Sequence, residues 1–196
     1  MDAMRLDLAP MTADAFLRWN EGREPKHELV DGVPVMMTGT TRAHNAVAVN
    51  VVLSLAPQVR SRGCDVSTSD FATRTGDYQV RYPDVVVDCG AGEPGDLAAT
   101  EPVLVVEIAS PSTREFDAVG KLAEYQSVPS IRYVLLVKPD VVDVASYERG
   151  EAGWSLTRFR GLDDVVPLAG LDASLPLAAL YEGLSPVVLP PLRPVG

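Results

Sequence analysis

One acidic residue interrupts an otherwise apolar run and limits how this chain can fold. Glu107 lies within residues 103–109, and all the remaining residues of this run are apolar. An apolar run of this length is typical of a strand buried on both faces of a sheet. A carboxylate placed there costs free energy unless a cation or an ion-pair partner faces it. We therefore expect the fold to bring positive charge to Glu107.

A second acid precedes a neighbouring apolar stretch. Asp84 follows Pro83 and opens the run 85–87. The spacing between Asp84 and Glu107 leaves room for one loop and a return strand. If both carboxylates bind the same cation, its positive charge offsets the free-energy cost of burying them. Two alternatives stay open: Asp84 as an ordinary strand-entry residue, and Glu107 as a buried ion pair with Lys121.

Composition sets the size and the charge of the domain. The chain has 196 residues and 46% hydrophobic content, which suits one well-packed domain. We predict a single domain over residues 1–184 and a proline-rich tail over 185–196. The net charge of −10 weighs against a general electrostatic attraction to nucleic acid, although the local electric field at a site matters more than the net charge of the chain.

The two cysteines and the terminus indicate the compartment. Cys64 and Cys89 are far apart in sequence and lack metal-ligand spacing, so reduced thiols are expected. Residues 1–7 contain no apolar signal segment, and no stretch is long enough to span a bilayer. The sequence therefore predicts a soluble, cytoplasmic protein with no membrane contact.

The periodicity predicts an α+β, or mixed α/β, domain with one central sheet. Helices are expected over 12–19 with Thr12 as cap, over 43–60 before Gly63, and over 112–128 with Ser112 or Thr113 as cap. A hairpin is expected around Asp31-Gly32, with Pro34 restricting its second strand to an edge or a bulge. Further strands are predicted over 65–74, 82–88, 103–110, 131–137, 141–147 and 154–159. The helix between strands 103–110 and 131–137 should make those two strands parallel and carry Lys121 toward Glu107.

Taken in order, several motifs resemble the Uma-type restriction endonuclease family, which is similar to the PD-(D/E)XK nuclease superfamily. The matching residues are Glu28-Leu29-Val30-Asp31-Gly32, His44, Tyr82-Pro83-Asp84-Val85, the run from Val105 to Ser112, Asp117, Lys121, Tyr125 and the run from Tyr133 to Val137. The match extends over roughly residues 12–180, so it is more specific than an isolated Pro-Asp. One departure is that Ala109 occupies the place of the superfamily lysine. In the Uma-type pattern, Lys121 of the following helix is the matching residue.

The resemblance implies a restriction-endonuclease-like mixed sheet flanked by helices and a metal-dependent DNA endonuclease that hydrolyses phosphodiester bonds. Asp84, Glu107 and the carbonyl of Ile108 would bind the metal, with Lys121 orienting water, acting as a base or stabilising the phosphate. Glu28 would complete the metal shell. An oxygen ligand set favours Mg²⁺ or Mn²⁺ over zinc. Cutting both strands would suit a homodimer, with the apolar segment 175–181 as a candidate contact.

Each remaining candidate also has a plainer interpretation. Lys121 lies four residues after Asp117, the spacing of a solvated helix pair. Glu28 beside a turn is usually exposed. His44 near a helix start and Tyr125 one turn after Lys121 are weaker candidates, for which capping and core packing are the alternatives. For the whole chain, the alternative is a non-catalytic binding or regulatory module on a nuclease-like fold, which the acidic charge and the displaced lysine favour.

Overall fold

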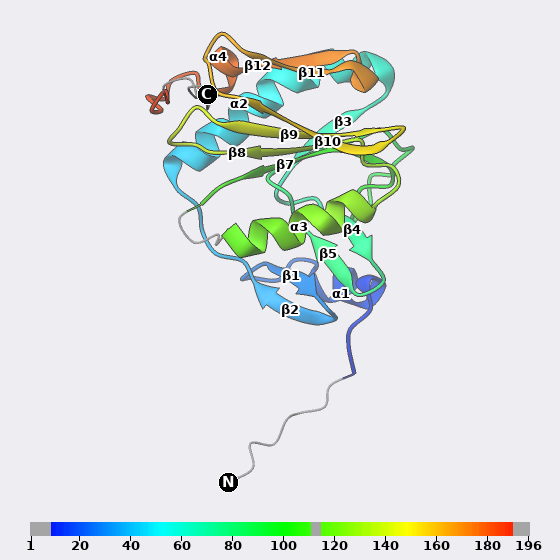
Figure 1. Ribbon diagram of the computed structural model, residues 1–196. Helices are drawn as coiled ribbons and strands as arrows, with labels where there is room; N and C mark the ends of the chain where they lie inside the picture. Colours follow the sequence, from blue (N-terminus) through cyan, green and yellow to red (C-terminus); the bar gives the residue numbers. More distant parts are fainter. Residues whose placement is uncertain (1–8, 111–114, 190–196) are drawn as a thin grey trace.

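The computed structural model describes residues 9–110 and 115–189, with side chains described again from Gly120 onward (Figure 1). The predicted caps Ser112 and Thr113 and the side chain of Asp117 lie outside this description. The chain forms a layered α+β domain, which confirms the predicted fold class. The described residues form three sheets where one was expected. No helix in the described ranges is long and apolar enough to cross a bilayer.

The central sheet has six strands in the order β10-β9-β8-β7-β6-β3. Its strands are β3 (Asp65–Thr68), β6 (Val85–Asp88), β7 (Pro102–Ile108), β8 (Tyr133–Val137), β9 (Val144–Gly150) and β10 (Gly153–Phe159). Strands β7 and β8 are parallel, as predicted, and the other neighbours are antiparallel. Helix α3 (Glu115–Ser127) makes the connection between the two parallel strands.

A smaller sheet lies on the α3 side of the molecule, in the order β2-β1-β5-β4 (Figure 1). Its strands are β1 (His27–Val30), β2 (Val33–Met36), β4 (Thr73–Gly76) and β5 (Gln79–Arg81). The β1–β2 turn has Asp31 and Gly32 at φ 49° and 78°, the left-handed conformations that an Asp-Gly hairpin supplies. Strand β2 is at the edge of the sheet, as Pro34 predicted.

Helix α1 (Ala13–Asn20) covers the small sheet, and its start is capped as predicted. The Thr12 hydroxyl accepts a hydrogen bond from the amide of Ala15 at 3.3 Å. Phe16 is buried with Leu29 of β1 and Val80 of β5. This apolar contact fixes the hairpin that carries Glu28.

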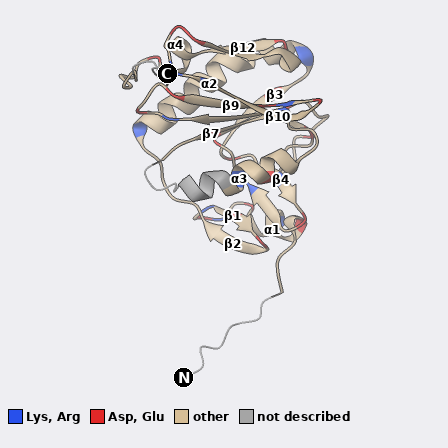
Figure 2. Ribbon diagram, in the orientation of Figure 1, with Lys and Arg blue, Asp and Glu red and all other residues tan. Residues whose placement is uncertain are grey.

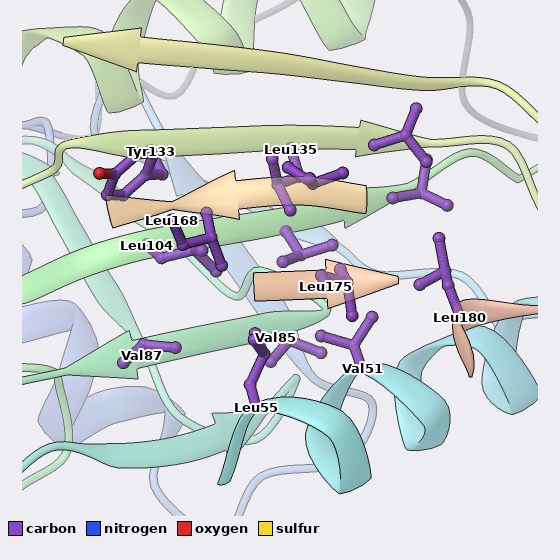
Figure 3. Close-up of a cluster of buried hydrophobic side chains, with 14 of the residues drawn as sticks. Val51, Leu55, Val85, Val87, Leu104, Tyr133, Leu135, Leu168, Leu175 and Leu180 are labelled. Carbon is purple, nitrogen blue, oxygen red and sulfur yellow. The ribbon is translucent and has the colours of Figure 1, made fainter. Parts of the chain in front are cut away.

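The main core lies between the central sheet and helix α2 (Arg42–Val59) (Figure 3). Val47, Val51 and Leu55 form its helical stripe, in agreement with the predicted periodicity. A third sheet, of β11 (Val165–Leu168) and β12 (Ala173–Pro176), packs beside α2 over the same face of the central sheet, and helix α4 (Leu177–Leu180) follows it (Figure 3).

The segment proposed as a dimer contact belongs to this core. Leu175, Leu177 and Leu180 are fully buried, and Tyr181 is 3% exposed. Their side chains are therefore not available to a second copy, and the predicted contact is wrong. A homodimer stays a prediction without an assigned interface.

Two strand predictions need correction. Residues 65–74 form two strands, β3 and β4, which belong to different sheets, because a turn at residues 69–70 redirects the chain. Residues 82–88 contribute only β6, which begins at Val85. Tyr82 and Asp84 lie in the crossing from the small sheet to the central sheet, so this crossing brings Asp84 between the two sheets.

The prediction of reduced cysteines is wrong, because Cys64 and Cys89 form a disulfide. Strands β3 and β6 are antiparallel with Asp65 opposite Asp88, so Cys64 and Cys89 are the next cross-strand pair. Their Cα atoms are 4.1 Å apart. The bond joins the residue before β3 to the residue after β6, and so connects two neighbouring strands of the central sheet.

Removing this disulfide should lower the free energy of unfolding. The bond closes a loop with a sequence separation of 25 residues. We expect Cys64→Ala/Cys89→Ala to lose about 3 kcal/mol, mainly because the unfolded chain becomes less constrained. Urea unfolding of the oxidised parent, the reduced parent and the variant measures this. The reduced parent should behave like the variant, and equal stability of all three would contradict the prediction.

Candidate active site

Asp84 and Glu107 are neighbours on the α3 face of the central sheet. Val85 pairs with Val106, so the positions of Asp84 and Glu107 are opposite each other across β6 and β7. Alternation along β7 places Leu104, Val106 and Ile108 in the α2 core. Glu107 consequently points to the opposite face, toward α3. The two predicted carboxylates are thus brought together by strand register.

One oxygen of Asp84 has two nitrogen neighbours. Its Oδ2 accepts a hydrogen bond from the amide of Ile108 at 2.7 Å and lies 3.2 Å from Nε2 of His44. His44 is in the first turn of α2, which Thr41 caps by accepting from the His44 amide. His44 is 5% exposed. These contacts orient the Asp84 carboxylate. The ring of His44 therefore belongs to the site, while its backbone amide takes part in the helix cap.

Glu107 is held by Tyr125 and faces Lys121. The Tyr125 hydroxyl donates to Glu107 Oε1 at 2.5 Å, and Lys121 Nζ is 3.9 Å from Glu107 Oε2. Burial raises the pKa of Glu107 to about 7, with a further rise from the negative charges of Asp84 and Glu28. Lys121 and Tyr125 oppose this rise. The structure thus brings Glu107 and Lys121 together, and their roles in a reaction stay a prediction.

Lys121 is a cation in this arrangement. Burial disfavours its charge, but the carboxylates of Glu107 and Glu28 outweigh burial and hold the pKa of Lys121 above its ordinary value. Its Nζ donates to Glu28 Oε1 at 2.9 Å. A raised pKa favours the ammonium form of Lys121, and so favours stabilisation of the phosphate over the role of a base among the roles that the resemblance implies.

Glu28 is buried, not exposed as a residue beside a turn usually is, and both of its oxygens have partners. Oε1 accepts from Lys121 and, at 3.4 Å, from the amide of Tyr82. Oε2 accepts from Arg81 at 3.0 Å, and Arg81 also makes two hydrogen bonds to Glu124 of α3, at 2.6 and 2.8 Å. Arg81 and Glu124 were not predicted. Nothing in their local sequence marks them, because their pairing depends on how α3 packs against β5.

The predicted residues line one pocket of about 240 Å³. Glu28, His44, Asp84, Glu107, Ile108 and Lys121 all contribute to its wall. Tyr125 is fully buried behind Glu107. Val35 and Met36 of β2 and the following Met37 also line the pocket. Outside this pocket, acidic and basic residues of the described chain are mixed with one another along the ribbon (Figure 2).

The donor chemistry of the pocket fits a divalent cation. Three carboxylates, of Glu28, Asp84 and Glu107, line the pocket with Lys121, and the ion pair of Arg81 with Glu124 lies next to Glu28. When all six groups are ionised the cluster has two excess negative charges, which one divalent ion would neutralise. No group of three or more His, Cys, Asp or Glu residues within the described ranges is arranged to hold a metal. Mg²⁺ does not need one, since it is commonly bound by one or two carboxylates together with water.

The fold and the site define a class of protein: an α+β domain with two carboxylates paired at a central mixed sheet and a lysine on the neighbouring helix α3. The chain belongs to the Uma2 family, described as "Putative restriction endonuclease", whose family model matches residues 13–178. Membership of this family supports a nuclease-like function and a hydrolase acting on nucleic acid.

Similar proteins span nearly the same length. Uncharacterized protein slr1290 of Synechocystis sp. is 28% identical over 181 residues, which are 89% of this chain and 93% of that protein. Uncharacterized protein sll1609 of the same organism is 28% identical over 158 residues, 77% of this chain and 88% of that protein. A crystal structure from Anabaena variabilis, of a "putative nuclease belonging to DUF820", superposes with a TM-score of 0.72 at 21% identity. It covers 88% of this chain and 98% of that one. This last likeness shows a shared fold.

Proposed function

We propose that this protein is a metal-dependent DNA endonuclease that hydrolyses phosphodiester bonds. The observation that carries the proposal is the meeting of Asp84, Glu107 and Lys121 in one pocket, with Lys121 Nζ 3.9 Å from Glu107. A buried carboxylate with a pKa near 7 beside a second acid and a lysine is typical of a functional site. A structural ion pair alone would not need Asp84 on the same face.

Asp84, Glu107 and the carbonyl of Ile108 would hold Mg²⁺ or Mn²⁺. When bound, the ion supplies charge neutralisation for the scissile phosphate and a water of lowered pKa. Glu28 has both oxygens engaged by Arg81, Lys121 and the Tyr82 amide. We therefore assign Glu28 to holding Lys121 instead of to direct metal ligation.

The other residues of the pocket orient these groups. His44 and the Ile108 amide hold one oxygen of Asp84, and Tyr125 holds one oxygen of Glu107. Lys121, protonated and 15% exposed at its side chain, presents positive charge to the pocket. That charge would stabilise the negative charge that develops on the phosphate during hydrolysis.

Plasmid cleavage tests this function directly. We expect nicking or linearisation with Mg²⁺ or Mn²⁺, no cutting with EDTA, and a loss of about 10³-fold in Asp84→Asn, because one ligand charge is removed. Asp163→Asn, in an exposed loop, is the matched control and should cut like the parent. Cutting that survives EDTA or Asp84→Asn would contradict the proposal.

A second candidate is a non-catalytic binding module on the same fold. It is favoured by the net charge of −10 and by exposed apolar residues of β2, where Val33 is 59% and Met36 is 58% exposed. Failure of the purified protein both to bind Mn²⁺ and to cut any DNA would support this candidate over the nuclease.

A further inference from the structure

Arg81 is a buried arginine at the end of β5 that links three elements. It is 4% exposed, and its guanidinium lies between two carboxylates. NH1 donates to Glu28 of β1 at 3.0 Å, whereas Nε and NH2 donate to the two oxygens of Glu124 of α3 at 2.8 and 2.6 Å. Thr75 of β4 adds a further hydrogen bond to Glu124 at 3.0 Å. The arginine therefore attaches α3 to the small sheet.

The attached helix is the one that supplies the pocket. Lys121 and Tyr125 are on α3, and Glu124 is three residues after Lys121, one turn along the helix. Asp84 and Glu107 belong to the central sheet, and α3 lies between the two sheets (Figure 1). The position of Lys121 relative to Glu107 thus depends on how α3 is held against the small sheet.

Glu28 is the second route from Arg81 to Lys121. It accepts from Arg81 through Oε2 and from Lys121 through Oε1. The Arg81 bond therefore fixes the carboxylate that in turn fixes the ammonium. Arg81 acts on Lys121 through Glu28 and also through Glu124.

We propose that Arg81 is the positioning residue of this site: it clamps Glu28 and Glu124 so that the Lys121 ammonium and the Tyr125 hydroxyl are aimed at Glu107. The part of this inference that concerns the reaction rests on the proposed nuclease function. The part that concerns the placement of Lys121 does not. Arg81→Lys would keep the positive charge but could not reproduce the bidentate hydrogen bonding to Glu124.

Chemical labelling of lysine tests the placement without any enzyme activity. The chain has three lysines, Lys26, Lys121 and Lys138, so a short pulse of acetic anhydride followed by peptide mass spectrometry resolves each one. In the parent, Lys121 is 15% exposed at its side chain and Lys138 is 54% exposed. Loosening of α3 in Arg81→Met should raise the labelling of Lys121 relative to Lys138 by about tenfold. In Arg81→Lys, the labelling of Lys121 relative to Lys138 should lie between the values for Arg81→Met and the parent.

Arg74→Met is the matched control, because Arg74 is on β4 of the same sheet and pairs with Asp14 away from Glu28. Circular dichroism before each pulse establishes that the variants are folded. Unchanged or reduced labelling of Lys121 in folded Arg81→Met would overturn the proposal. If Arg81→Met does not fold, Arg81→Lys decides by the same comparison.

Kinetics then test the consequence for the reaction. In Arg81→Met we expect kcat to fall about 100-fold, because a displacement of about 1 Å is enough for such a loss. Mn²⁺ affinity should stay within about threefold, since Asp84 and Glu107 are untouched, and Arg81→Lys should recover part of kcat. Cutting at the parent rate would overturn the positioning role. A parent that does not cut at all would count against the nuclease, while the labelling result still decides the role of Arg81.

Discussion

Replacing Lys121 with methionine is expected to preserve metal binding and to slow DNA cleavage by about 10³-fold. Methionine keeps most of the aliphatic stem and removes only the ammonium. Glu28 would retain Arg81 and the Tyr82 amide as partners, so the fold should tolerate the change. Mn²⁺ affinity should be equal or higher, because a positive charge 3.9 Å from Glu107 is removed.

The measurements are Mn²⁺ titration calorimetry and single-turnover cleavage, both at pH 8.5. That pH matters because Lys121 lowers the pKa of Glu107, and the variant would keep its Glu107 protonated to higher pH than the parent. Lys138→Met, at a site 54% exposed, is the control and should match the parent in both assays. Parent-like cleavage by Lys121→Met would leave this lysine as the ion-pair partner of Glu28 and nothing more.

The central part of the fold could be predicted because its signals are local. Strands β6, β7 and β8 were predicted from their apolar runs. The parallel pairing of β7 with β8 was predicted from the length of the connection between them. Since side chains alternate along a strand, an acid in an apolar run has to face one side of the sheet. Asp84 and Glu107 were thus predictable as a pair, and the resemblance added Lys121 from the next helix.

What could not be predicted depends on contacts between distant segments. The Cys64–Cys89 bond follows from the register of β3 with β6, and this pairing was not apparent from two short strands of different composition. The split of residues 65–74 into strands of two sheets depends on tertiary packing in the same way. Arg81 and Glu124 are ordinary charged residues until α3 packs beside β5, where both become partly or fully buried.

Replacing Glu107 with glutamine should stabilise the metal-free protein in a pH-dependent way. Burial and the nearby charge of Asp84 raise the pKa of Glu107 from 4.5 to about 7. The folded state therefore holds the Glu107 proton more tightly than the unfolded state does. This contribution to stability is fully present below pH 4.5 and is lost as pH rises through 7. Glutamine stays neutral throughout and can still accept from Tyr125.

The difference in unfolding free energy between Glu107→Gln and the parent should consequently grow from near zero at pH 4.5 to about 3 kcal/mol at pH 8. Urea unfolding across this range measures it, with Glu151→Gln in the exposed β9–β10 turn as the control. Excess Mn²⁺ at pH 8 should stabilise the parent and leave the variant unchanged, since ligand binding to the folded state adds to its stability. A gain that is the same at every pH would mean that packing, not the Glu107 charge, is responsible. A pH-dependent gain without any effect of Mn²⁺ would mean that the buried charge destabilises the fold without serving a metal.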